Sequence, residues 1–284
     1  MSKPKLSKSN KQKAGGATKP RSVSQKSACP EALDCKKAWD EIEKETDVIT
    51  SNGGDTDPIE RNRHISAAYA KLYQKNPRLK WAGLASIVSR QAGCAMKDAG
   101  GRRSQLVGGG DAKVAYEALA KANKTIFEDI YPAMSFYDRY GLRGMEKCGD
   151  TPGHQVPDEL KEAIKKIDEG KVRAGADMIA NYEQKNVVQK KVYADPKVKK
   201  TFERNQDAAN SWYSYPASWF GARKPEIALS AECGQGTPVP FVGDINDPAD
   251  RVKYYNSLMK EFDKLSETTG WNAKTQQEIV NGAN

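Results

Sequence analysis

Apolar residues recur at spacings of three and four along most of this chain, and proline or glycine bounds the segments that carry them. This spacing places the apolar side chains on one face of an α-helix. Asp57-Pro58 marks one helix start, because aspartate caps a helix N-terminus and proline is tolerated in the first turn. Asp247-Pro248 repeats this signal late in the chain. Since no convincing alternation of apolar and polar residues accompanies these segments, the pattern predicts an all-α fold.

About nine helices are expected, forming a single irregular bundle. They cover 31–45, 58–76, 79–97, 112–130, a segment beginning at Pro132, 157–170, 171–194, 197–213 and a segment from Pro248 to Leu265. In the fourth of these, the spacing predicts that Val114, Leu119, Ile126 and Phe127 face inward. Prolines, glycines and aromatic residues crowd 214–247, which predicts a long irregular segment packed by its own side chains.

The net charge of +9 is concentrated near the start of the sequence. Residues 1–27 hold eight Lys and Arg residues and no acid, which leaves 38 basic and 37 acidic residues for 28–284. The composition of 1–27 predicts a disordered basic tail, followed by one all-α domain over 28–284. A nearly neutral body argues against sequence-specific binding of nucleic acid. The tail can still bind anionic surfaces without specificity.

Several classes of protein are disfavoured by what the sequence lacks. No apolar stretch approaches the roughly 18 residues of a transmembrane helix, and no apolar region follows the basic start as in a Sec signal peptide. His64 and His154 are too far apart to indicate a zinc site. Cys29 and Cys35 can close a short disulfide loop or remain free thiols, and both alternatives stay open. None of the common enzyme motifs occurs.

Four polar segments interrupt helices that otherwise have buried character, and they supply the candidate site residues. These are Asn62, Arg63, Ser89, Arg90, Asn123, Glu128, Asp129, Glu183 and Gln184. A buried charge must be paired, because an unpaired one costs several kcal/mol. One interpretation is therefore a polar pocket for an anionic or metal-linked ligand, and the other is a structural salt-bridge network or solvated helix faces. The carboxylates among these residues lack the spacing of a metal motif, so no metal ligand is assigned and the cofactor stays unknown.

The same segments resemble a family of uncharacterised bacterial proteins, the YppC-like family. The matching text comprises Arg61-Asn62-Arg63, 81–93, 122–132, 182–186 and Asp250-Arg251-Val252. The resemblance spans roughly 58–262 and implies no chemistry, but it coincides with the polar segments and so favours a pocket. More loosely, the chain is similar to type VI secretion effectors of Gram-negative bacteria that are linked to iron acquisition.

The looser similarity to type VI secretion effectors implies a function and an export route for the protein. The protein would be made in the bacterial cytoplasm and exported without a Sec signal, with a type VI spike or adaptor protein as its partner. Its helical body would bind a ligand or a partner protein. The alternative is a hydrolase or antibacterial toxin that uses a buried Arg and carboxylate constellation, with Glu128, Asp129 or Glu183 as general base. Whether the protein is an enzyme stays open.

Overall fold

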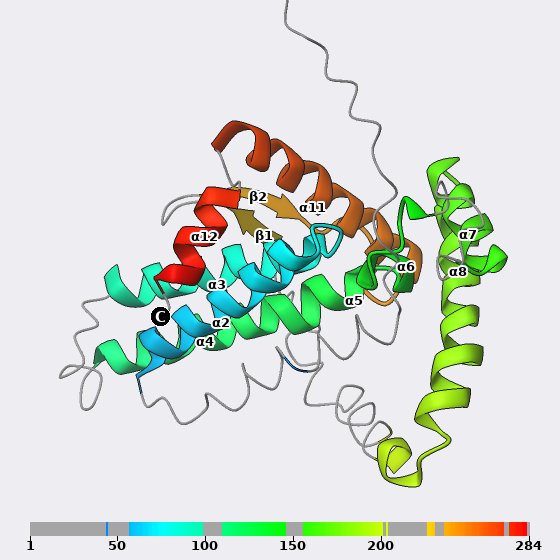
Figure 1. Ribbon diagram of the computed structural model, residues 1–284, viewed down its shortest axis with the longest axis horizontal. Coiled ribbons are helices and arrows are strands. Elements are labelled where there is room, and N and C mark those ends of the chain that lie inside the picture. The colour runs from blue at the N-terminus through cyan, green and yellow to red at the C-terminus, as the bar shows by residue number, and fades with distance from the viewer. Residues whose placement is uncertain are drawn as a thin grey trace, which may run out of the picture. The chain divides into compact units, whose positions relative to one another are not determined.

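The structure, a computed structural model, describes residues 44, 57–98, 110–145, 156–200, 203, 226–230, 236–269 and 273–282. Within these residues nine α-helices, two π-helical segments and two short strands are present (Figure 1). The mainly helical fold predicted from the sequence is confirmed. The predicted tail over 1–27, Cys29 and Cys35, and most of the expected helices over 31–45 and 197–213 lie outside the described residues.

The α-helices are α2 (Pro58–Lys75), α3 (Lys80–Asp98), α4 (Gly110–Lys124), α5 (Tyr131–Ala133), α6 (Phe136–Arg139), α7 (Asp158–Asp168), α8 (Val172–Glu183), α11 (Pro248–Thr269) and α12 (Ala273–Asn281). The π-helical segments η2 (Thr125–Ile130) and η4 (Gln184–Val192) continue α4 and α8. The strands are β1 (Glu226–Leu229) and β2 (Thr237–Pro240). Sequence reasoning did not predict α12.

The local signals for the ends of α2 and α7 behave as expected. The Asp57 side chain accepts a hydrogen bond from the backbone N–H of Ile59 at 3.0 Å, and Pro58 occupies the first helical position. Gly170 follows α7 with φ of +83°, a backbone conformation that glycine adopts without a steric penalty. Both boundaries are set by residues within a few positions of the helix end, so the sequence alone predicts them.

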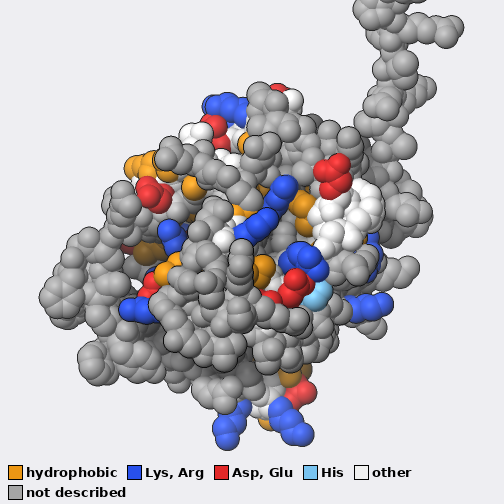
Figure 2. All heavy atoms as spheres, turned by 90° about the vertical axis from the view of Figure 1, so that its left-hand side faces the viewer, with side chains coloured by type: hydrophobic (Ala, Val, Ile, Leu, Met, Phe, Trp, Pro, Cys, Tyr) orange, Lys and Arg blue, Asp and Glu red, His pale blue; other side chains and the backbone are white. Residues whose placement is uncertain are grey.

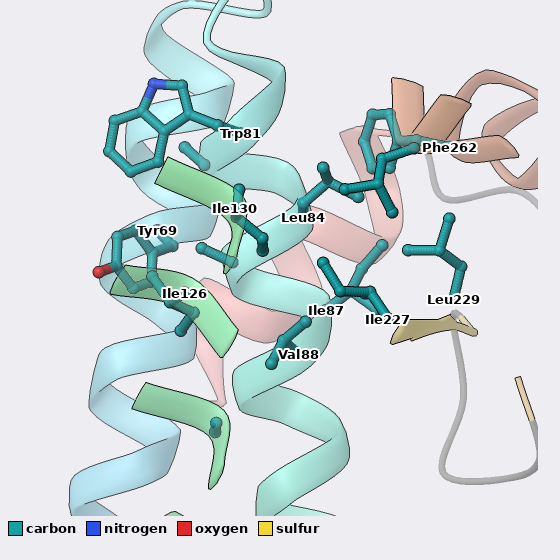
Figure 3. Close-up of a cluster of buried hydrophobic side chains, with 14 of the residues drawn as sticks. Tyr69, Trp81, Leu84, Ile87, Val88, Ile126, Ile130, Ile227, Leu229 and Phe262 are labelled. Carbon is teal, nitrogen blue, oxygen red and sulfur yellow. The ribbon is translucent and has the colours of Figure 1, made fainter. Parts of the chain in front are cut away.

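The first hydrophobic core lies where α2 and α3 pack together, and α4, η2, α11 and the two strands complete it. Figure 3 shows its buried side chains, which come from segments far apart in the sequence. Trp81 packs edge-on against Tyr69 and Tyr131, with ring centroids 5.9 and 5.6 Å apart. Ala82 and Ala85 are fully buried, and residues this small allow a close approach of two helices.

The expectation that 214–247 is irregular throughout is wrong at two places, because β1 and β2 form an antiparallel pair. Ile227 pairs with Val239, and both side chains are buried. Each strand has four residues, which is too short for an alternating pattern to stand out in the sequence. The side chains of Ile227 and Leu229 point into the first core beside Phe262 (Figure 3).

The expected single helix over 112–130 is also corrected, because α4 ends at Lys124 and the chain continues as a π-helix. The backbone N–H of Tyr131 bonds to the carbonyl of Ile126, a spacing of five residues instead of four. The wider turn buries Ile126 and Ile130 and turns Phe127 outward, where it is 52% exposed. Val114, also predicted to face inward, is 43% exposed.

A second hydrophobic core joins α6, α7, α8 and the first turn of α11. Its helices approach closely at Gly175, where an added Cβ atom would lie 2.5 Å from the backbone oxygen of Ala163. Glycine at this position therefore permits the contact between α7 and α8. The two cores are connected through α11, since Val252 belongs to the second and Leu258 to the first.

None of the helices in the described part of the chain is both long and apolar enough to cross a membrane.

Candidate functional site

A pocket of about 340 Å³ lies between α2, α3 and α12, and we call it the α2–α3–α12 pocket. Ile59 of α2 and Ile279 of α12 supply apolar walls. Arg63 of α2 and the pair Arg90 and Lys97 of α3 supply cationic groups. The pocket therefore combines apolar surface with positive charge, which suits a ligand that carries both an apolar body and an anionic group.

The buried amide of Asn62 forms part of the pocket wall. Its Nδ2 donates a hydrogen bond to the backbone carbonyl of Ser89, and the residue is only 1% exposed. Its Oδ1 is buried and has no hydrogen-bond partner among the described residues. A buried acceptor without a donor costs about 1 to 3 kcal/mol, so a ligand that brings a donor to this atom would gain affinity.

Two serine side chains hold α2 and α3 together behind this wall. The hydroxyl of Ser66 donates to the backbone carbonyl of Ser86 at 3.1 Å, and the hydroxyl of Ser86 donates to the carbonyl of Ser66 at 2.9 Å. Both residues are buried. This reciprocal pair fixes the register of the two helices and thereby positions Asn62 and Arg90 relative to each other.

Cationic groups outnumber acidic groups at the pocket. Arg63 forms an ion pair with Glu60 at 2.8 Å, one turn earlier on α2, and half of its side chain is exposed. Glu278 is the acidic residue of the lining, which also holds three cationic residues. Figure 2 shows a face of the molecule on which basic and acidic side chains lie beside hydrophobic ones. An anionic group entering this pocket would meet a net positive field.

The structure brings together only part of the predicted site. Asn62, Arg63 and Arg90 line the α2–α3–α12 pocket, and Ser89 contributes the carbonyl that holds Asn62. The hydroxyl oxygen of Ser89 is buried without a hydrogen-bond partner in the described residues. The other predicted residues lie on different elements and do not line this pocket.

Asn123 at the end of α4 is half-buried, and Glu128 and Asp129 follow in η2. Glu128 is exposed and lies 3.8 Å from the ammonium group of Lys124. Burial raises the pKa of Asp129 to about 6, while the charge of Lys124 opposes the rise and that of Glu128 adds to it. Two carboxylates on one π-helical turn therefore have different environments.

Glu183 lies at the end of α8 and forms an ion pair with Arg139 of α6 at 2.5 Å. Gln184, the next residue, is exposed in η4. Glu183 is therefore a half-buried, paired charge, and its partner was not among the predicted residues. Within the part of the chain that the structure describes, no group of three His, Cys, Asp or Glu side chains is arranged to hold a metal ion.

Sequence reasoning missed Lys97, Glu278 and Ile279 in the pocket. Lys97 lies in the last turn of α3, where its sequence context indicates an ordinary surface lysine. The other two belong to α12, where buried Gln276 and half-buried Ile279 lie three residues apart. That spacing was the sequence feature that could have indicated a helix here. It is a weak indication, because α12 has only nine residues and few of them are apolar.

Comparison with known proteins places this chain in a family whose function is unknown. The family model described as Protein of unknown function (DUF2515) matches residues 57–284. The chain is also similar to the uncharacterized protein YppC of Bacillus subtilis (strain 168), with 41% identity over 71 residues. The matched stretch is 25% of this chain and 22% of that relative's length. No solved structure matches the chain.

Proposed function

We propose that this chain, which belongs to the DUF2515 family of proteins of unknown function, binds a small amphiphilic anion in the α2–α3–α12 pocket. The ligand has an apolar body, an anionic group and a hydrogen-bond donor. The observation that carries the proposal is the placement of Arg63, Arg90 and Lys97 around a pocket of about 340 Å³ with isoleucine walls.

Each part of the ligand has a counterpart in the pocket. The apolar body would lie between Ile59 and Ile279 and would gain the free energy of removing apolar surface from water. The anionic group would lie at the mouth of the pocket with Arg90 and Lys97. The donor would satisfy Oδ1 of Asn62, which lacks a partner among the described residues. The cationic groups of Arg63, Arg90 and Lys97 disfavour a ligand with a cationic head.

Three eight-carbon probes with different head groups test the proposal: octanoate, octanol and octylamine, titrated calorimetrically into the full chain. We expect saturable binding of octanoate, weaker binding of octanol and none of octylamine. Arg90→Gln and Lys97→Gln should each weaken octanoate binding about tenfold, since a charge-assisted hydrogen bond contributes about 1.5 to 3 kcal/mol. Lys71→Gln, an exposed change on α2 outside the pocket, is the matched control. Equal binding of the three probes would refute the proposal.

Export by a type VI apparatus, with a spike or adaptor partner and a role in iron acquisition, stays a prediction from the looser sequence likeness. It is tested by comparing culture supernatants of strains with and without an active apparatus. Equal amounts of the protein in both would remove it.

A hydrolase or toxin is the second candidate function, and the raised pKa of Asp129 supports it. A carboxylate with a pKa of about 6 is suited to act as a general base near neutral pH. Asp129 does not line the α2–α3–α12 pocket, however, so ligand binding is the better supported function. A toxin predicts that expression of the chain arrests bacterial growth and that Asp129→Asn abolishes the arrest, with Glu128→Gln as the control.

A further inference from the structure

A second cavity, of about 190 Å³, lies between α6, α8 and the first turn of α11. Phe136, Ile179 and Val252 of the second hydrophobic core form part of its wall. Its charged groups are Arg139, Glu183 and Arg251, and we call it the Arg139–Arg251 cavity. It shares no lining residue with the α2–α3–α12 pocket.

Arg139 is held in place from several sides. Its backbone carbonyl accepts a hydrogen bond from the indole N–H of Trp81 at 3.2 Å. Its guanidinium carbon lies 5.5 Å from the centre of the Tyr131 ring, a cation–π distance, and its Nη2 donates to Glu183. The Nε of Arg139 is nevertheless buried without a hydrogen-bond partner in the described residues.

Arg251 lies in the first turn of α11, and its Nε is also buried with no hydrogen-bond partner in the described part of the chain. Burial lowers the pKa of Arg251, and the positive charge of Arg139 lowers it further, against the carboxylates of Asp247 and Glu183. The two guanidinium groups line the same cavity, so their positive charges repel each other. Asp247 is engaged elsewhere, since it pairs with Arg173 and accepts from the backbone N–H of Ala249.

The cavity is therefore lined by two guanidinium groups and one carboxylate, and the Nε atom of each guanidinium group has no hydrogen-bond partner among the described residues. An oxyanion placed between the guanidinium groups would relieve their repulsion and accept hydrogen bonds from them. The planar donor geometry of arginine matches the oxygens of phosphate. We propose that the Arg139–Arg251 cavity binds a phosphate group, either as free inorganic phosphate or on a small phosphomonoester.

Glu183 acts as the competitor of this ligand. In the structure its carboxylate lies 2.5 Å from Nη2 of Arg139 and accepts a hydrogen bond from it. A bound phosphate would therefore share this donor or displace the carboxylate. Removing the carboxylate charge would therefore strengthen phosphate binding. A purely structural salt bridge predicts no such gain, which gives the proposal a distinctive outcome.

The full chain, purified in a phosphate-free buffer, is titrated with inorganic phosphate and, in a second arm, with glycerol 3-phosphate. Binding is followed by calorimetry and by broadening of the phosphorus NMR line. We expect saturable binding, weakened at least tenfold in Arg251→Gln and tightened severalfold in Glu183→Gln. Tighter binding in one arm identifies whether the free ion or the ester is preferred. Lys71→Gln, an exposed change that lines neither cavity, should leave the affinity unchanged.

Arg251→Lys provides a milder test if Arg251→Gln fails to fold, because it keeps the charge and removes the guanidinium donors. We expect about a tenfold loss of phosphate affinity with an unchanged far-ultraviolet circular dichroism spectrum. The proposal is overturned if wild-type protein shows no saturable binding in either arm. It is equally overturned if Arg251→Lys binds like wild type or if Lys71→Gln loses as much affinity as Arg251→Gln.

Discussion

A Cβ atom on Gly93 of α3 would lie 2.8 Å from Nδ2 of Asn62 on α2, closer than real Cβ atoms approach a neighbour. The same Nδ2 donates to the carbonyl of Ser89, one turn before Gly93 on α3. The glycine and the asparagine are thus a matched pair, in which the absence of one side chain makes room for the other. Because both line the α2–α3–α12 pocket, this contact sets the shape of its wall.

Gly93→Ala should destabilise the protein even though alanine is the better helix former. The propensity gain is about 1 kcal/mol, whereas forcing an extra carbon into a packed contact costs about 1 to 3 kcal/mol. We expect a net loss of about 1 kcal/mol in the free energy of unfolding, measured by urea denaturation. Asn62→Ala combined with Gly93→Ala should recover part of that loss, since the colliding amide is gone. If Gly93→Ala alone is as stable as wild type, the side chain of Asn62 moves aside without a cost in free energy.

Ser66→Ala and Ser86→Ala should each cost about 1 kcal/mol of stability, because each removes one hydroxyl of the reciprocal pair. The double variant should cost less than the sum of the two, since the hydroxyls also lie 3.3 Å from each other and neither is then left behind. A thermodynamic cycle from four urea titrations measures this coupling. Strict additivity would mean that the two hydroxyls act independently.

Asp129 should make stability depend on pH between 4 and 7. Its pKa in the folded state is about 6, against an ordinary value of 3.8, so the native state holds the proton more tightly. The stability that this tighter proton binding contributes is fully present below pH 3.8, the ordinary pKa, and is lost as pH rises through the folded-state pKa of about 6. The free energy of unfolding of Asp129→Asn should therefore increase by about 1 to 2 kcal/mol relative to that of wild type as pH rises from 4 to 7. This magnitude allows for the partial exposure of Asp129 to solvent.

Chemical denaturation of both proteins at several pH values measures that gain. Glu128→Gln removes a charge that raises the pKa of Asp129, so it should reduce the pH dependence of stability that Asp129 contributes. A stability difference between Asp129→Asn and wild type that stays constant from pH 4 to 7 would contradict a raised pKa at this group.

Arg143→Ala should be more destabilising than the loss of a typical surface ion pair. Asp138 is nearly fully buried, and Arg143 donates to it through Nε at 2.8 Å. Burial lowers the pKa of Arg143, but the carboxylates of Asp138 and Asp168 outweigh that effect and raise it. Removing the guanidinium leaves the Asp138 charge buried beside the hydroxyl of Ser135, at a cost of about 2 to 3 kcal/mol.

Lys80→Ala is the comparison for that variant, because it breaks an exposed pair with Asp263 and should cost below about 1 kcal/mol. Asp138→Asn in the Arg143→Ala background should recover part of the loss, since the buried group is then neutral. Thermal unfolding of the three variants distinguishes these outcomes. Similar losses for Arg143→Ala and Lys80→Ala would show that Asp138 is stabilised by other means.

Part of the candidate site was visible in the sequence. Asn62, Arg63 and Arg90 stand out because polar residues interrupt apolar helix faces, and the structure places them at one pocket. The pairing of Glu183 with Arg139 was not visible, since nothing over their sequence separation of 44 residues indicates which helices meet. Arg139 and Arg251 each look like an ordinary charged residue near the end of a helix.

The sequence by itself determined where several helices of the described chain begin or end, such as α2, α3 and α7, because caps, prolines and apolar spacing act over one or two turns. It did not reveal the π-helical turns or the short strands, where packing against the two hydrophobic cores overrides local preference. Only the tertiary structure decided which polar side chains share a pocket. Such contacts depend on how helices cross and slide past one another, which is set by the packing of small residues such as Ala82, Gly93 and Gly175.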